Sequence, residues 1–305
     1  MGLNRFSVLL VGAGSLGTAI LKLLCELEPK TVGIVDGDIV ERKNLKNQQI
    51  YTVKDVVNIT NKADACVKEL SSKHKKTKLT SYPFYITDKN AARLVTNYDV
   101  IIDATDSIQS RAIVNYACIL GARPLLMVSA KDDNGLAYII TGDSACFNCI
   151  KRNSNLTDNS CYSISIKLSN AIAALAVDEL LAYIEKRNGK AQILEFSLKS
   201  NRVSRYYVKK DAACEVCNSG APYKQTTDDM FIHACGNALK FSFKRELDTE
   251  KLKVIFGHKS AVRNGYLILR EGNKSLFISS FGDVLMTGYD ERSAQAILSR
   301  ISSAT

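Results

Sequence analysis

The chain has 305 residues, of which 46% are hydrophobic and 24% charged, and its formal net charge is +10. This composition is globular, and the length is sufficient for one large domain or two. Lys22 and Glu26 interrupt the first apolar stretch, so we expect no membrane-spanning segment. A strand pattern begins almost at once, which leaves no room for a secretory signal. The nine cysteines are an odd number, which argues against a disulfide framework and favours a reducing cytoplasm.

Strand and helix patterns alternate from residue 7 to residue 208. The predicted strands are residues 7–11, 31–36, 79–85, 100–103 and 124–129, with hairpin-like strands at 136–141 and 192–208. The predicted helices are residues 15–26, 62–70, 89–97, 107–120 and 164–184. This alternation predicts an α/β fold, with a Rossmann-like, mostly parallel sheet and helices on both faces. We expect the last helix to be central or to lie at a subunit contact.

The sequence changes character after Cys217, where a turn-rich and then polar stretch begins. We place a linker at residues 219–232. Further strand patterns follow at 239–243, 266–270, 275–279 and 284–287, and helix patterns at 249–256 and 291–301. The chain is therefore predicted to divide into a large domain at 1–218, the linker, and a small α+β appendage at 233–305.

A glycine-rich turn joins the first predicted strand to the first helix, with Gly12, Gly14 and Gly17 in a GxGxxG spacing. Such glycines let backbone N–H groups approach a phosphate at a helix N-terminus. Asp36 ends the second strand, where a carboxylate can hold ribose hydroxyls. The alternative is that Asp36 only caps the following turn. The order strand, glycine turn, helix, strand, acid predicts a nucleotide site.

Polar residues around this turn favour ATP with magnesium over a nicotinamide cofactor. Asp38, Asn44 and Gln48 follow the second strand, Lys62 begins the next helix, and Asp106 follows a buried strand. An ammonium group can neutralise phosphate charge, and a carboxylate can ligate Mg²⁺. A hydride-transfer site would need an apolar nicotinamide pocket instead. An NAD-dependent oxidoreductase remains an alternative.

Two CxxC pairs lie far apart in the chain. They are Cys146 with Cys149 and Cys214 with Cys217. This spacing lets a turn present both sulfurs to one ion, so the four thiolates predict a tetrahedral structural Zn²⁺. A redox-active CxxC is the alternative, which the presence of two such pairs disfavours.

Taken together, these residues resemble the ThiF/MoeB/HesA family of ubiquitin-activating-enzyme-like adenylyltransferases. The matching motifs are residues 12–17, 36–38, 44–45, Gln48, Lys62, 103–106 and the two CxxC pairs. They occur in the family's order across residues 6–218. The tail, from Cys235 through Gly265 to Asp290, is more weakly similar to an appendage of some archaeal and bacterial members.

The resemblance implies ATP-dependent adenylation of the C-terminal glycine carboxylate of a small ubiquitin-fold protein ending in Gly-Gly. It also implies a homodimer and a possible downstream conjugating or sulfurtransferase protein. By position, Asp36 would hold the ribose and Asp106 the magnesium, with Arg111 supporting Asp106 or the adenylate. Three residues would contact the phosphates: Asn44, Gln48 and Lys62. A membrane is not an expected partner, because we expect no membrane-spanning segment. Nucleic acid is not expected either, because the basic run at 73–78 has no interleaved aromatic residues.

The chain departs from the family where a phosphate-contacting arginine is usual, because Asn47 occupies that position. Many relatives also begin with a helix that donates an arginine across a dimer, whereas only Arg5 precedes the first strand here. Arg42, Lys43 or Lys46 could substitute. A weakened relative that only docks a ubiquitin-fold partner is therefore a second alternative.

Cys161 lies in a polar stretch just before the long helix. The resemblance implies that a cysteine here can form a thioester, persulfide or mixed disulfide with the carrier, and an inert, partly buried thiol is the alternative. The remaining cysteines are predicted to be small core residues: Cys25, Cys66, Cys118 and Cys235.

Overall fold

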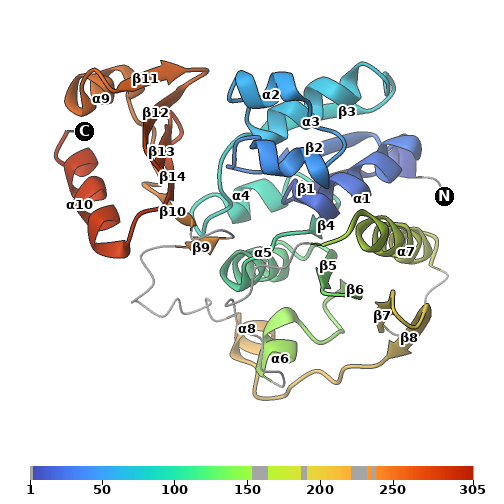
Figure 1. Cartoon of the computed structure of the whole chain (residues 1–305). Helices are drawn as coiled ribbons and strands as arrows, with labels where there is room; N and C mark the ends of the chain where they lie inside the picture. The colour runs from blue at the N-terminus through green and yellow to red at the C-terminus, as the bar shows by residue number, and fades with distance from the viewer. Residues whose placement is uncertain (1–2, 153–163, 187–190, 221–231, 235–237, 305) are drawn as a thin grey trace.

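The computed structural model describes residues 3–152, 164–186, 191–220, 232–234 and 238–304 (Figure 1). Two β-sheets organise these residues. The first sheet and its helices carry the blue to golden part of the chain, and the second sheet, with two helices, carries the orange to red part. This is the predicted α/β fold with a small C-terminal α+β unit. The predicted domain boundaries stay a prediction, and most of the predicted linker lies outside the described residues.

The first sheet has eight strands in the order β3-β2-β1-β4-β5-β6-β7-β8. The strands are β1 Ser7–Val11, β2 Thr31–Val35, β3 Lys78–Tyr82, β4 Val100–Asp103, β5 Leu125–Lys131, β6 Asn134–Ile140, β7 Ile193–Ser197 and β8 Arg202–Tyr206. The five strands β3, β2, β1, β4 and β5 pair parallel with their neighbours. Strands β5, β6, β7 and β8 pair antiparallel, as the hairpin-like patterns predicted. The strand order reverses beside β1, with β2 on one side and β4 on the other. In doubly wound folds this switch point is where ligands bind.

Helices cover both faces of the first sheet. They are α1 Ser15–Glu26, α2 Val53–Val57, α3 Lys62–Ser71, α4 Ala91–Val95, α5 Ile108–Leu120, α6 Phe147–Arg152, α7 Ile166–Ile184 and α8 Glu215–Ser219, with 3₁₀ turns η1 Leu3–Arg5 and η2 Arg42–Lys46. One core lies under α1, α3 and α7, and the other lies under α4 and α5. The long helix α7 packs against α1 and β6. Within the described residues, no helix combines the length and the apolar character that a membrane span requires.

Asparagine and serine caps determine where two of these helices begin. The Asn61 carboxamide oxygen accepts the N–H of Ala63 at 2.7 Å, so Lys62 becomes the first residue of α3. Ser107 caps α5 in the same way by accepting the N–H of Ser110. These caps set the first residues of α3 and α5.

The second sheet is antiparallel, with the order β11-β12-β13-β14-β10-β9. Its elements are β9 Ile232–Ala234, β10 Ala238–Ser242, α9 Thr249–Phe256, β11 Ser260–Arg263, β12 Tyr266–Glu271, β13 Lys274–Ser279, β14 Asp283–Thr287 and α10 Glu291–Ser302. Leu267 and Leu276 face a core shared with α9 and α10. Their strand neighbours Ile268 and Phe277 lie in a separate buried cluster with Ile39, which belongs to the first part of the chain. The second sheet is therefore apolar on both faces, and one face packs against the segment that follows β2.

Candidate functional site

Close packing explains two of the three glycines in the turn after β1. Gly12 has a φ of +94°, and a Cβ there would lie 2.9 Å from the carbonyl of Ala104. A Cβ at Gly17 would lie 1.9 Å from the carbonyl oxygen of Gly12, so α1 could not approach the turn. A Cβ at Gly14 would meet nothing within 4 Å. Gly14 is also the N-cap of α1 and has no side-chain cap, which leaves the helix N-terminus open to a ligand.

Asp36 joins the glycine turn to the end of β2. Its carboxylate accepts the N–H of Ala13 at 2.8 Å and the N–H of Asp38, also at 2.8 Å. Burial raises the pKa of Asp36, and the charge of Lys62 partly offsets this. The second contact is the turn cap that the sequence left as an alternative. The ribose contact of Asp36 stays a prediction.

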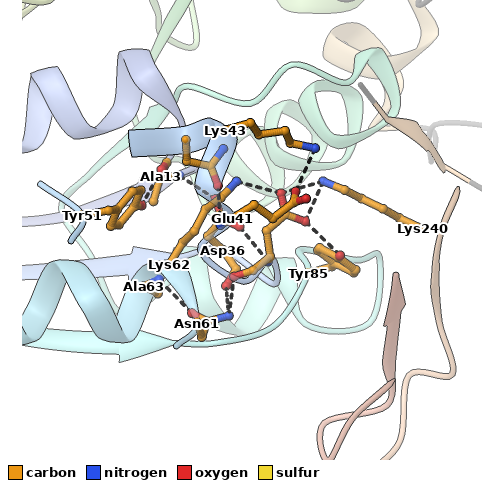
Figure 2. Close-up of polar contacts among 12 residues, drawn as sticks. Ala13, Asp36, Glu41, Lys43, Tyr51, Asn61, Lys62, Ala63, Tyr85 and Lys240 are labelled. Atoms are coloured by element: carbon orange, nitrogen blue, oxygen red, sulfur yellow. Dashed lines mark hydrogen bonds and ion pairs between the residues drawn. The ribbon is translucent and has the colours of Figure 1, made fainter. Parts of the chain in front are cut away.

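Asp38 is the centre of a group that we call the Asp38 cluster: Asp36, Asp38, Lys62, Tyr85 and Lys240. The Nζ of Lys62 lies 2.9 Å from one oxygen of Asp38, and the Nζ of Lys240 lies 2.8 Å from the other. The Tyr85 hydroxyl donates to Asp38 at 2.9 Å. Figure 2 shows Lys240 and Tyr85 approaching from the side opposite Tyr51 and Ala13. The structure thus brings together the predicted residues Asp36, Asp38 and Lys62, and it adds two that the sequence did not suggest.

Charge pairing governs the ionisation of this cluster. Burial alone would raise the pKa of Asp38, but the charges of Lys240 and Lys62 outweigh it and hold that pKa well below its usual range. Burial would lower the pKa of Lys62, and the charges of Asp38 and Asp36 raise it instead. Both lysines therefore stay protonated at neutral pH. The negative charge of Asp106 also helps to raise the pKa of Lys62 and of Lys240, so Asp106 lies within electrostatic reach of both.

The predicted phosphate contacts on the loop after β2 differ in their surroundings. Asn44 is buried, and its carboxamide oxygen accepts the N–H of Glu41 at 2.8 Å, which caps η2. Gln48 is also buried, and its Oε1 has no hydrogen-bond partner among the described residues. Asn47 donates to the carbonyl oxygen of Ile164, just before α7, at 3.2 Å. Asn47 therefore joins η2 to the segment that leads into α7.

Arg42, Lys43 and Lys46 could replace the arginine that is missing at Asn47. The structure gives none of them a contact with the Asp38 cluster. Arg42 and Lys46 are exposed. Lys43 pairs with Glu41 at 2.8 Å, and its side chain is 57% exposed.

The end of β4 carries Asp103, Asp106 and, one turn into α5, Arg111. Asp103 is fully buried, and its carboxylate accepts the backbone N–H and the hydroxyl of Thr105 at 2.9 and 2.6 Å. Arg111 lies 3.5 Å from Asp103 and donates to the carbonyl oxygens of Thr105 and Val128. Arg111 therefore holds the loop that leads to Asp106, which is itself exposed. Its predicted contact with the adenylate stays a prediction.

The two CxxC pairs come together as a cysteine cluster of Cys146, Cys149, Cys214 and Cys217. The four Sγ atoms all lie within 4.8 Å of one another. Adjacent pairs lie 3.6 to 3.8 Å apart, a spacing that one tetrahedral ion can bridge. Burial raises the pKa of Cys146 to about 11, so its thiol keeps its proton at neutral pH unless a metal ion replaces it. This cluster could hold a metal. Cys161 lies outside the described residues.

The observed arrangement fits a nucleotide with its phosphates at the N-terminus of α1. The open approach at Gly14, the unpartnered Oε1 of Gln48 and the ammonium of Lys62 are complementary to a polyphosphate and its sugar. Tyr51, whose hydroxyl donates to the carbonyl of Ala13 at 2.6 Å, was not predicted from the sequence. Asn61 was not predicted either, although an asparagine directly before a helix pattern is a recognisable cap signal.

Known proteins resemble this chain in sequence and in fold. The ThiF family model matches residues 2–216. The sulfur carrier protein ThiS adenylyltransferase of Bacillus subtilis is 28% identical over 263 residues, which are 82% of this chain and 77% of that protein. The sulfur carrier protein adenylyltransferase of Thermus thermophilus is 35% identical over 145 residues, 48% of this chain and 50% of that protein.

Solved structures with the same fold include E. coli MccB with ATP. It superposes with a TM-score of 0.62 at 18% identity, covering 70% of this chain and 67% of that one. At this identity the likeness establishes the fold alone, whereas the family match extends over most of the chain. The chain belongs to the ThiF family.

Proposed function

We propose that this chain is an adenylyltransferase that uses ATP to adenylate the C-terminal carboxylate of a small ubiquitin-fold sulfur-carrier protein. The observation that carries the proposal is the Asp38–Lys62 pair beside an open glycine turn at the switch point of the sheet. Two relatives named as adenylyltransferases of sulfur carriers support the substrate class. The carrier carboxylate would attack the α-phosphorus, the bond to the β-phosphate would break, and pyrophosphate would leave.

Several side chains would hold ATP in this proposal. Asp36 would bind the ribose, and phosphate contacts would come from the helix N-terminus after Gly14 and from Asn44, Gln48 and Lys62. Asp106 would bind Mg²⁺, which supplies positive charge to the phosphate oxygens. Arg111 would position Asp106 through the carbonyl of Thr105. Pairing with Asp38 keeps Lys62 protonated and oriented before the nucleotide arrives.

The cysteine cluster would bind one structural Zn²⁺. Four thiolates complete a tetrahedral coordination sphere, which leaves no position for a substrate or water. The metal would join the segment after β6 to the segment after β8. Its contribution in this proposal is to folding, not to catalysis.

The partners belong to the same proposal. The carrier would end in Gly-Gly, the protein would act as a homodimer in the cytoplasm, and a conjugating or sulfurtransferase protein would accept the activated carrier. The names of the relatives favour sulfur transfer over conjugation. A covalent adduct with Cys161 would be seen by non-reducing electrophoresis with carrier and ATP, and it should disappear in Cys161→Ala.

Exchange of radioactive pyrophosphate into ATP tests the proposal. We expect exchange that requires both Mg²⁺ and a carrier protein ending in Gly-Gly, and a loss of about 100-fold or more in Asp106→Ala. Asp143→Ala, which changes another exposed aspartate, is the matched control. NAD binding without ATP binding would instead indicate an oxidoreductase. Carrier binding without exchange would indicate a docking protein. The observation in favour of that alternative is Asn47, which stands where relatives have a phosphate-contacting arginine.

A further inference from the structure

The second sheet contributes a charged side chain to the candidate nucleotide site. Lys240 lies on β10, 202 residues from Asp38 in the sequence, and its Nζ is 2.8 Å from Oδ1 and 3.0 Å from Oδ2 of that aspartate. Its side chain is only 15% exposed. We propose that Lys240 contacts the phosphates of the bound nucleotide, so that the second sheet supplies the cation that the chain lacks at Asn47. This inference rests on the proposed ATP site.

Contacts from β12 and β14, which lie on one side of β10 in the sheet, hold the second sheet against the first part of the chain. The Asn61 carboxamide donates to the Tyr266 hydroxyl at 3.1 Å, and the backbone N–H of Tyr85 donates to Asp283 at 2.7 Å. Further residues of both parts form one buried apolar cluster: Ile39, Ile59, Ala238, Tyr266, Ile268, Phe277 and Leu285. These contacts fix β10 beside the candidate site, so Lys240 is positioned without a ligand.

Tyr85 restricts the path of the lysine side chain. The Lys240 Nζ lies 5.2 Å from the centre of the Tyr85 ring, while the hydroxyl of that ring donates to Asp38. Figure 2 shows Lys240 and Tyr85 side by side, with Lys240 pointing toward the group that contains Lys62. The ring contact favours the charged form of the lysine at this position.

The hydrogen bonds of Asp38 allow Lys240 to change partner. Among the described residues, Asp38 accepts from Lys62, Lys240 and Tyr85. If Lys240 moved to a phosphate, Asp38 would keep two donors and would not become a buried unpaired charge. The flexible stem of a lysine permits this movement without a change in the backbone. The charge of Asp106, the proposed Mg²⁺ ligand, also helps to raise the pKa of Lys240.

The competing account is that Lys240 only clamps the two sheets together. A clamp would affect stability and would act on all ligands of the site alike. A phosphate contact would act on ATP and not on adenosine, because only ATP carries phosphates. The ratio of the two affinities therefore distinguishes the accounts.

The experiment measures dissociation constants for ATP with Mg²⁺ and for adenosine, using the full chain. We expect Lys240→Met to raise the Kd for ATP about 10-fold or more, as for a lost hydrogen bond to a charged group, with the Kd for adenosine unchanged. Lys240→Arg should retain most of the ATP affinity. Lys244→Met is the matched control, since Lys244 pairs with Asp88 between the same two parts of the chain. It should leave both constants unchanged.

An unchanged Kd for ATP in folded Lys240→Met overturns the inference, as does an equal loss for ATP and adenosine. If Lys240→Met does not fold, Lys240→Gln replaces it, because the amide can still donate to Asp38 without the positive charge. A wild-type chain that fails to bind ATP overturns both the inference and the proposed function. A wild-type chain that binds ATP with no dependence on Lys240 overturns the inference alone.

Discussion

The cysteine cluster and the Asp38 cluster are assembled in different ways. The cysteine cluster takes all its side chains from the starts of two short helices, α6 and α8, and each start supplies a pair three residues apart. The Asp38 cluster takes Lys62 from 24 residues away and Lys240 from 202 residues away. The first is a set of four like groups that one metal ion could bridge. The second is a set of opposite charges that already satisfy one another.

This difference indicates where each cluster acts. Removing one thiol from a metal site removes a ligand that nothing else replaces, so the effect falls on folding. Removing one member of the Asp38 cluster leaves other charges in place, so the effect falls on ligand binding and chemistry. Variants that affect stability in one cluster and function in the other therefore test the comparison.

The largest expected effect is in the cysteine cluster. Cys214→Ser should abolish binding of one Zn²⁺ per chain and lower the free energy of unfolding by several kcal/mol. Cys118→Ala changes a buried free cysteine outside the cluster and should keep the metal. Elemental analysis and thermal unfolding provide the two measurements. Full zinc content in Cys214→Ser would refute this set of ligands.

The next effect concerns Lys62. Lys62→Met should reduce pyrophosphate exchange by about 100- to 1,000-fold, because the proposed phosphate contact is lost from a buried site. Lys68→Met is the control on the same helix, where a side chain that is 68% exposed lies 3.8 Å from Asp55. Exchange kinetics compare the two variants. Equal exchange rates in the two variants would show that Lys62 does not take part in the reaction.

An effect on pH dependence is expected at the contact between the sheets. Burial raises the pKa of Asp283 from 3.8 to about 7 in the folded chain, and hydrogen bonds from Ser242 and Tyr85 only partly offset it. Between these values the folded state binds a proton that the unfolded state has lost, so this contribution to stability falls as the pH rises from about 4 to about 7.

Asp283→Asn keeps a carbonyl acceptor for the Tyr85 N–H and cannot ionise. We expect it to flatten this part of the stability profile, and to stabilise the chain at pH 8 by up to about 4 kcal/mol. Urea unfolding at several pH values is the measurement. If the stability of Asp283→Asn depends on pH as in the wild type, Asp283 is not the group responsible for this pH dependence.

The smallest expected effect is at Tyr51. Tyr51→Phe removes the hydroxyl that donates to the Ala13 carbonyl in the glycine turn. The loss should cost about 1 kcal/mol of stability and weaken ATP binding slightly. Tyr207→Phe, which changes a residue that is 62% exposed, is the control and should change neither quantity. Thermal unfolding with and without ATP compares them, and identical behaviour of the two variants would contradict this role.

Local patterns predicted most of the fold. The bounds of β1 and α1 are those expected from the sequence, because a β-branched run and an apolar helix pattern meet at the glycine turn. The short strand β11 and the short helix α2 were missed, since few residues carry their periodicity. For α2 a signal was present, because Thr52 and Asp55 form a capping box.

The candidate site was predictable only where its residues belong to local motifs. The CxxC pairs and the residues after β2 are such motifs. The structure brings the four cysteines together and places Asp36 and Asp38 beside Lys62. Lys240 has no motif, and its position depends on how the apolar face of the second sheet packs against Ile39 and Ile59. Sequence patterns predict that such a face exists, but they do not predict which surface covers it.

The most direct test of the proposed function is the mass of the carrier protein after incubation with the purified chain, ATP and Mg²⁺. Our account predicts a carrier that gains one adenylyl group at its C-terminal glycine, with pyrophosphate as the other product. The adduct should be absent with Asp106→Ala and present with Asp143→Ala. An unmodified carrier, or hydrolysis of ATP to ADP and phosphate, would contradict adenylation as the function of this site.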